Sequence, residues 1–316
     1  MIRPLPADVA ALLDRGAFCY LGVRTPGGLH ATPVVYAVWD HALWVTTARR
    51  SVKARTWRTD RRVAGLVRTE AGSVVFGGVV RAHDLLDPTT WMASAANVHR
   101  ITAAAVAFTR RNARFFAGYA VDARRVPLAW TPPGRVFARV DLERIALIRG
   151  GGVSARGGFG RTVGSHTSFR AGRGADPLEG IPDAVRQRIG VGGPAALALE
   201  GRLGPLVLPA TWWPEGGWAY AVLPEARVRL AAVAGEAPAS LTVDHASRWR
   251  ASAMTGVLLQ GGASVFVLDR LRSGAGSAAS IVRRAGLDPK GAALVRLRPD
   301  RVVWWRGWSA GTVRRT

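Results

Sequence analysis

The most informative stretch of this chain for its fold lies at residues 43–67 and reads LWVTTARRSVKARTWRTDRRVAGLV. It begins as an apolar run of strand type, passes through a polar turn into a short helix-like segment, and ends in a second apolar run. A phosphate monoester carries up to two negative charges and is bound best by several donors that converge from one side. Residues 46–55, which we call the phosphate loop, offer such donors at Thr46, Thr47, Ser51, Lys53 and Arg55.

Two residues of the phosphate loop, Ser51 and Lys53, are the most informative about its function. Ser51 is suited to cap a helix that begins near Val52, and backbone N–H groups at that end would add to the donors. Lysine is rare in this chain: of 44 basic residues only Lys53 and Lys290 are lysines, and the other 42 are arginines. A charged turn that leads into a solvated helix has the same composition, so spacing alone leaves both interpretations open.

Further apolar runs of strand type surround the phosphate loop. They lie at 17–23, 30–38, 42–47, 62–68, 73–84 and 135–148, and are separated by turns such as TPGG, WDH and TEAG. A helix is expected from Pro88 onward, because apolar residues recur at helical spacing at Trp91, Ala95, Val98, Ile101 or Thr102, Ala105 and Phe108. Five or six antiparallel strands with a helix before the last one predict a small β-barrel and not a βαβ fold.

The second half of the chain repeats this pattern. RVDLERIALIRG at 139–150 aligns without a gap with RLRPDRVVWWRG at 296–307, at a constant offset of 157, and the acidic Glu143 recurs as Asp300. An internal duplication explains the repeat economically, and chance similarity between strands rich in arginine and valine is the alternative. We therefore expect a mainly β (α+β) chain made of two tandem barrels.

The segment between the two halves has a different composition. Residues 149–180 are dominated by glycine, serine and arginine and lose apolar periodicity, which is typical of a flexible linker that buries little. Its ARGGFGR stretch is similar to arginine–glycine RNA-binding tails, which is the alternative interpretation. The predicted division is a first domain at 1–149, a linker at 150–180 and a degenerate second domain at 181–316.

The formal net charge of +23 predicts a positive surface that attracts phosphates, polycarboxylates and nucleic acid. The arginines are spread along the chain, so we expect a solvated basic surface and no dedicated nucleic-acid partner. No run of about 18 apolar residues occurs, and Asp8 and Asp14 interrupt the N-terminal segment, which predicts no membrane partner, no secretory signal and a cytoplasmic location. The single cysteine, Cys19, is expected at a buried strand position.

Taken in order, these motifs resemble the pyridoxamine 5′-phosphate oxidase-like superfamily of split β-barrels, whose members bind flavin mononucleotide (FMN) or, in some cases, a deazaflavin. The shared features are a short first helix, a strand with His30 followed by Pro33 to Tyr36, a strand that ends in threonine, and a Ser-x-Lys-x-Arg turn before a helix. The resemblance is good over residues 8–85, fair at 135–150 and weak in the second half.

The resemblance implies roles for particular residues. It assigns the cofactor phosphate to Thr46, Thr47, Ser51 and Lys53, with Arg49 and Arg55 as helpers. It assigns the flavin ring to the strand of Pro33, Val34, Val35 and Tyr36. Members of the superfamily build the cofactor site between two barrels, so two tandem split β-barrels in one chain imply an intrachain pseudo-dimer, and further association into homo-oligomers stays open.

The second copy has lost the phosphate loop. Where the first copy reads TTARRSVKAR, the second reads VLPEARVRLA at 222–231, and Glu225 there would repel a phosphate. We therefore expect one cofactor site in each pseudo-dimer, with the second copy as a wall. Candidate wall residues are Trp212, Trp213 and Arg227, and a core position for both tryptophans is the alternative.

The leading hypothesis for function is an FMN-dependent oxidoreductase that acts on a small organic substrate. The alternatives are a deazaflavin-dependent reductase, a non-catalytic cofactor- or haem-binding protein, and binding of nucleic acid by charge alone. No acid–base pair, metal-ligand cluster or nucleophilic triad stands out in the sequence, and catalytic residues stay unassigned. This fits flavin chemistry, in which the cofactor carries the reaction and the protein positions it.

Overall fold

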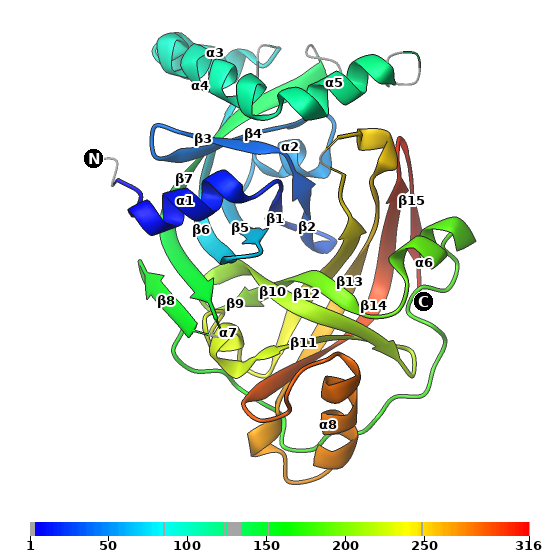
Figure 1. Ribbon diagram of the computed structural model, residues 1–316. Helices are drawn as coiled ribbons and strands as arrows, with labels where there is room; N and C mark the ends of the chain where they lie inside the picture. Colours follow the sequence, from blue (N-terminus) through cyan, green and yellow to red (C-terminus); the bar gives the residue numbers. More distant parts are fainter. Residues whose placement is uncertain are drawn as a thin grey trace.

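The apolar runs of the first half become strands of one antiparallel sheet, and those of the second half become another. The computed structural model describes residues 4–84, 86–122, 124, 134–150, 152–247 and 249–315. Figure 1 shows the two halves in contact through their strands, with a layer of helices at the outer end of the first half. The prediction of a mainly β chain with two tandem split barrels is confirmed.

The first half contains the strands predicted around the phosphate loop and most of the described helices. In chain order its elements are α1 (Ala7–Arg15), β1 (Cys19–Thr25), β2 (Gly28–Val34), β3 (Tyr36–Trp39), β4 (Ala42–Ala48), α2 (Val52–Thr56), β5 (Arg62–Thr69), β6 (Gly72–His83), η1 (Pro88–Thr90), α3 (Trp91–Ala95), α4 (Val98–Arg111), α5 (Ala113–Val121), β7 (Arg135–Arg149) and β8 (Gly152–Arg156). Cys19 is fully buried in β1, as expected from the apolar run around it.

The second half follows the same order with shorter connections. Its elements are α6 (Asp183–Ile189), β9 (Gly193–Gly201), β10 (Gly204–Glu215), β11 (Trp218–Pro224), α7 (Glu225–Arg229), β12 (Glu236–His245), η5 (Ala251–Ala253), β13 (Thr255–Val267), η6 (Leu268–Arg270), α8 (Ala275–Arg284), β14 (Ala292–Arg306) and β15 (Ser309–Arg314).

The strand order of the two sheets is the same. Six strands of the second half close a ring in the order β10-β9-β12-β13-β14-β11, because β10 pairs with both β9 and β11. In the first half the corresponding order is β2-β1-β5-β6-β7-β4, and β3 pairs with β4. The strand that matches β10 is divided at Val35, so that β2 pairs with β1 while β3 pairs with β4. Both halves are therefore barrels of one topology, and only the first is split at this strand.

The sequence repeat has a structural cause. Strands β7 and β14 begin and end at the same offset of 157 residues. Each carries a β-bulge: the pairing of β7 with β6 skips Glu143, and the pairing of β14 with β13 skips Asp300. A bulge adds one residue to a strand and bends it, which a small barrel requires. The recurring acidic residue is therefore the bulge residue of each barrel.

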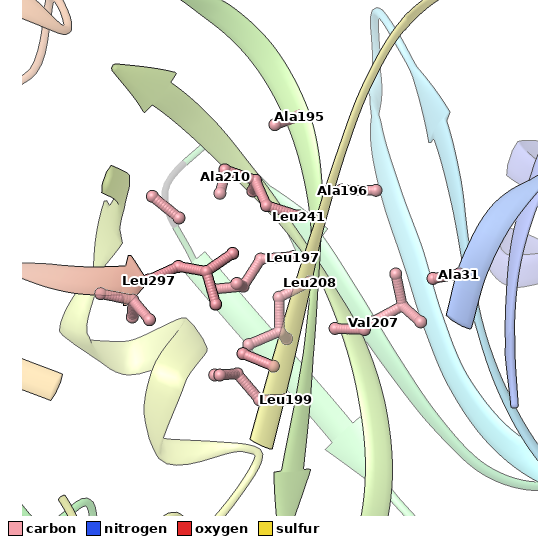
Figure 2. Packing of buried hydrophobic residues seen from close by; sticks show 14 of the residues in the cluster. Ala31, Ala195, Ala196, Leu197, Leu199, Val207, Leu208, Ala210, Leu241 and Leu297 are labelled. Carbon is pink, nitrogen blue, oxygen red and sulfur yellow. The ribbon is translucent and has the colours of Figure 1, made fainter. Parts of the chain in front are cut away.

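The two halves pack against each other in a reciprocal way. Strand β2 of the first half packs on β12 and β13, and its counterpart β10 packs on β5 and β6. In Figure 2, Val207 of β10 points toward Ala31 of β2 within one cluster of buried residues that draws on both halves. The side chain of Gln260 donates a hydrogen bond to the carbonyl oxygen of Leu29 at 2.6 Å. This is the isologous pattern of a twofold dimer, here inside one chain.

The segment between the halves is not the loose linker that its composition predicted. After β8, its described residues run along the second half, where Val163, Phe169 and Leu178 are buried. Gly160 N–H donates to Leu230 O at 3.0 Å, so the backbone is held as well. The expectation that this segment buries little is wrong. Burial of a few apolar side chains, spaced among many glycines, is enough to hold the extended chain against the second half.

The helical region after β6 forms as predicted, and Phe108 of the predicted apolar stripe is buried, but other members of the stripe are exposed. Ala104 and Phe108 of α4 point inward. Trp91 is 54% exposed and Val98 is 60% exposed, although their spacing placed them on the inner face. Trp91 is the first residue of α3 and Val98 is the first residue of α4, so both exposed side chains lie at helix starts, away from the buried turns of α4.

Candidate functional site

The phosphate loop has the local structure that its sequence predicts. Strand β4 ends at Ala48, and Ser51 caps α2 by accepting a hydrogen bond from the backbone N–H of Ala54 at 3.1 Å. The hydroxyl of Thr47 donates to the Ser51 hydroxyl oxygen at 3.0 Å. These bonds bring the strand end and the helix start together around one opening.

A cavity of about 220 Å³ lies at this opening, between β2, β4 and α2. Most of the residues that the sequence assigned to cofactor binding line it, namely Pro33, Val34, Val35, Thr46, Thr47, Ser51 and Lys53. Residues 20 positions apart thus meet because β3, which follows β2 after Val35, pairs with β4, and β4 leads into α2.

Lys53 is a buried cation of this cavity. Its side chain is 3% exposed, and its ammonium group is hydrogen-bonded to the hydroxyl of Thr32. None of the described residues that line the cavity is a carboxylate. Burial in this setting lowers the pKa of Lys53 to about 7. Near neutral pH the lysine is therefore poised between its two protonation states.

His30 lies in the same cavity and stays neutral. Burial lowers the pKa of its imidazole, the positive charges of Lys53 and Arg301 contribute in the same direction, and together they bring it to about 3. At any ordinary pH the ring carries one donor nitrogen and one acceptor nitrogen.

Three of the predicted site residues lie outside the cavity. Tyr36 is fully buried in the core of the first half, where its hydroxyl donates to the carbonyl oxygen of Leu13. Arg49 forms an ion pair with Asp84 at 2.7 Å. Arg55 is exposed on the outer side of α2.

Several residues of the cavity were missed by sequence reasoning. Arg135, at the start of β7, donates to the Thr46 hydroxyl oxygen at 3.0 Å from its Nε. Phe18, Thr32 and Phe115 come from the first half, and Met254 comes from the second. Thr32 directly precedes Pro33 and could have been included, but the others reach the cavity through long-range packing that leaves no local pattern.

The second copy has no equivalent loop. Glu225, at the start of α7, is engaged by Arg229 at 2.9 Å and by Arg270 at 2.5 Å. Arg227 approaches the carbonyl oxygen of Pro209 at 3.4 Å. Trp212, one of the candidate wall residues, is fully buried in the core of the second half. Among the described residues, Met254 is the one that the second half contributes to the cavity.

The part of the chain that the structure describes lacks two further features. No helix there is long and apolar enough to cross a membrane. No group of three or more histidine, cysteine, aspartate or glutamate side chains there is arranged to hold a metal ion.

Comparisons with known proteins find similarity at the level of structure. No protein-family model matches the chain, and no curated protein matches it. A conserved hypothetical protein from Mycobacterium tuberculosis is 22% identical, with 47% of this chain and 86% of that chain covered and a TM-score of 0.33. A pyridoxamine 5′-phosphate oxidase-related, FMN-binding protein from Nostoc punctiforme is 14% identical, with 49% and 89% covered and a TM-score of 0.37.

A haem-binding protein from Mycobacterium smegmatis is 15% identical, with 50% of this chain and 60% of that chain covered and a TM-score of 0.34. Each of these structures matches about half of the chain, the length of one barrel. Because these TM-scores are low, we assign the fold from the strand order of the chain itself. The chain is a tandem pair of split β-barrels, and the solved structures that resemble one half of it include a pyridoxamine 5′-phosphate oxidase-related, FMN-binding protein.

Proposed function

We propose that the cavity between β2, β4 and α2 binds the phosphate end of FMN, and that the chain is an FMN-dependent oxidoreductase acting on a small organic substrate. One observation supports this above all others: a buried lysine ammonium group faces the cavity with no carboxylate among the described lining residues. A buried cation is costly unless it is paired, and a bound phosphate would supply the missing partner.

The other polar groups of the cavity fit a phosphate as well. Ser51 and Thr32 present hydroxyl groups beside the ammonium group of Lys53, and Arg135 adds a guanidinium group at the Thr46 side. Guanidinium and ammonium groups form the strongest hydrogen bonds that proteins make to phosphate oxygens. The donor set is therefore that of a dianion site.

The rest of the lining suits a flat apolar ring. Pro33, Val34 and Val35 form one side, and Phe18 and Met254 are further apolar members of the lining. A volume of about 220 Å³ is less than complete small-molecule sites usually have, so we assign the phosphate end to the cavity and the ring to its apolar rim. When bound, FMN would supply the hydride or electron transfer; the chain's own residues hold, orient and dehydrate it.

Haem is the competing ligand, because His30 and Met254 line the same cavity and neutral imidazole and thioether are both axial haem ligands. The small volume favours FMN. The visible absorbance of the purified protein separates these possibilities, since flavin, deazaflavin and haem have different band patterns.

The phosphate assignment is tested by titrating cofactor-free protein with FMN and with riboflavin, which lacks the phosphate. Lys53→Met should weaken FMN binding by about 1.5–3 kcal/mol, the usual size of a charge-assisted hydrogen bond, and leave riboflavin binding unchanged. Lys290→Met is the matched control, because it removes the only other lysine from an exposed position. Equal FMN affinity in wild type and Lys53→Met, or parallel loss of both ligands, contradicts the assignment.

The catalytic part of the proposal needs a separate measurement. Bound flavin should be reduced and reoxidised through many cycles when a donor and a small organic acceptor are supplied. Protein that binds FMN tightly but never turns over would be a cofactor-binding protein and not an enzyme.

A further inference from the structure

A second cavity, of about 460 Å³, adjoins the first. It lies between the end of α1, the start of β1 and the junction of α4 with α5. Phe18, Val35 and Phe115 line both cavities, so these three side chains form a common apolar wall. A molecule in the second cavity would therefore lie next to whatever occupies the apolar rim of the first.

The junction that forms this cavity is fixed in place by hydrogen bonds. Arg111 donates to the carbonyl oxygens of Leu13 at 2.7 Å and Gly16 at 2.8 Å, which closes the end of α1. Asn112 donates to the carbonyl oxygen of Tyr36 at 3.1 Å. Both residues bind backbone groups, so these hydrogen bonds hold the end of α1 and strand β3 against the junction of α4 with α5.

The cavity carries an excess of positive charge. Arg15, Arg110 and Arg114 line it, and none of them forms an ion pair with a described residue. Its one carboxylate among the described lining residues, Asp14, is already engaged by Arg111 at 3.3 Å. Three guanidinium groups thus line one opening, and no carboxylate among the described residues is paired with them.

We propose that this second cavity binds an organic anion, a planar apolar body with a carboxylate or phosphate group, as the substrate of the flavin site. The guanidinium groups of Arg15, Arg110 and Arg114 would bind the anionic group in two-point contacts, and the common apolar wall would contact the body. The role of this anion as a substrate rests on the proposed function, whereas the anion site itself does not.

The test uses the cofactor-free full chain and three probes: naphthalene-2-carboxylate, its neutral carboxamide, and 2-naphthyl phosphate. We expect wild type to bind the carboxylate or the phosphate at least about tenfold more tightly than the carboxamide, as charge-assisted bonds require. The anion that binds more tightly identifies the charged group. The variant Arg15→Gln/Arg110→Gln/Arg114→Gln should lose this preference and bind all three probes alike.

General attraction to a basic protein is controlled by Arg188→Gln/Arg202→Gln/Arg283→Gln. These three arginines are exposed and lie in the second half, and their removal lowers the net charge by the same amount. The control should keep the preference for the anion. The anion site is overturned if the preference for the anionic probes over the carboxamide survives in Arg15→Gln/Arg110→Gln/Arg114→Gln. It is also overturned if this preference falls equally in both triple variants.

Failure of this inference can be told from failure of the proposed function. Selective anion binding by a protein that does not bind FMN supports the anion site and removes its role as a substrate site for flavin. FMN binding without any preference between carboxylate and carboxamide overturns the anion site alone. Circular dichroism of each triple variant confirms that the fold is retained before either result is interpreted.

Discussion

Lys53 combines two properties that conflict unless a ligand is present. It is a basic group, yet its surroundings are apolar or hydroxylic, and burial lowers its pKa to about 7. A phosphate dianion would stabilise the ammonium form and raise this pKa again. The residue that most favours a phosphate site is therefore also the residue whose protonation should respond to binding.

This leads to a prediction for pH dependence. Between a pKa of about 7 in the free protein and a higher pKa in the complex, FMN binding takes up a proton. We expect the dissociation constant of FMN to rise as pH increases above about 7, with a limiting slope of about tenfold per pH unit. Titrations from about pH 7 to pH 9, in which phosphate itself stays a dianion, measure this slope.

Lys53→Met and riboflavin are the two controls for the pH effect. Lys53→Met has no ammonium group to titrate, and riboflavin has no phosphate to raise the pKa. Both should give a much flatter profile. An identical slope in wild type and Lys53→Met would mean that another group titrates and that Lys53 does not contact the phosphate.

Among the elements, the extended segment between the barrels differs most from its sequence-based prediction. Phe169 is 3% exposed, and its ring packs with that of Phe266 at a centroid distance of 5.1 Å and that of Tyr220 at 6.2 Å. The segment therefore contributes to the core of the second barrel, and its glycines let the backbone follow the surface closely.

We accordingly predict that Phe169→Ala lowers the free energy of unfolding by about 3–5 kcal/mol, the usual cost of truncating a buried phenylalanine. Thr162→Ala, at an exposed position in the same segment, should change it by less than about 0.5 kcal/mol. Denaturant unfolding of the two variants gives the comparison. Equal stability would restore the interpretation of this segment as a loose linker.

Other elements followed their sequence patterns closely. Alternation and turn residues located the strands, and Ser51 located the start of α2, because these features depend on neighbours in the chain. The division of one strand at Val35, and the exposure of Trp91, depend on contacts with distant residues and could not be derived from spacing.

At the scale of the whole molecule, the two barrels are held by a reciprocal interface. Arg144 donates to the carbonyl oxygen of Pro205 at 2.9 Å, and its counterpart Arg301 lies against Gly27. Each arginine follows the acidic bulge residue of its own barrel and reaches the first hairpin of the other. This shared geometry is the structural counterpart of the sequence repeat.

A close approach of the two sheets at Gly22 provides a prediction. A Cβ atom at Gly22 would stand 2.9 Å from Cγ2 of Val207 across the interface, closer than such atoms normally come. Gly22→Ala should therefore lower the free energy of unfolding by about 1–3 kcal/mol through overpacking. Gly262→Ala is the control, because a Cβ atom there meets nothing within 4 Å.

The double variant Gly22→Ala/Val207→Ala makes the test specific. Removing the Val207 methyl groups relieves the contact, so the combined effect should be smaller than the sum of the single effects. Thermal or denaturant unfolding measures all four proteins. Strict additivity would show that the halves do not approach each other at this point.

The sequence by itself determined the strands, the cap of α2, the repeat and the chemical character of the phosphate loop. These features are encoded in residues that are close in the chain, where alternation, capping and charge act locally. Only the tertiary structure decided which side chains share a cavity, because Arg135, Phe115 and Met254 reach it from strands and helices far away in sequence. The burial of Lys53 is also a property of the tertiary structure. The sequence shows a basic residue, whereas the packing around it removes the ammonium group from water and so favours binding of an anion.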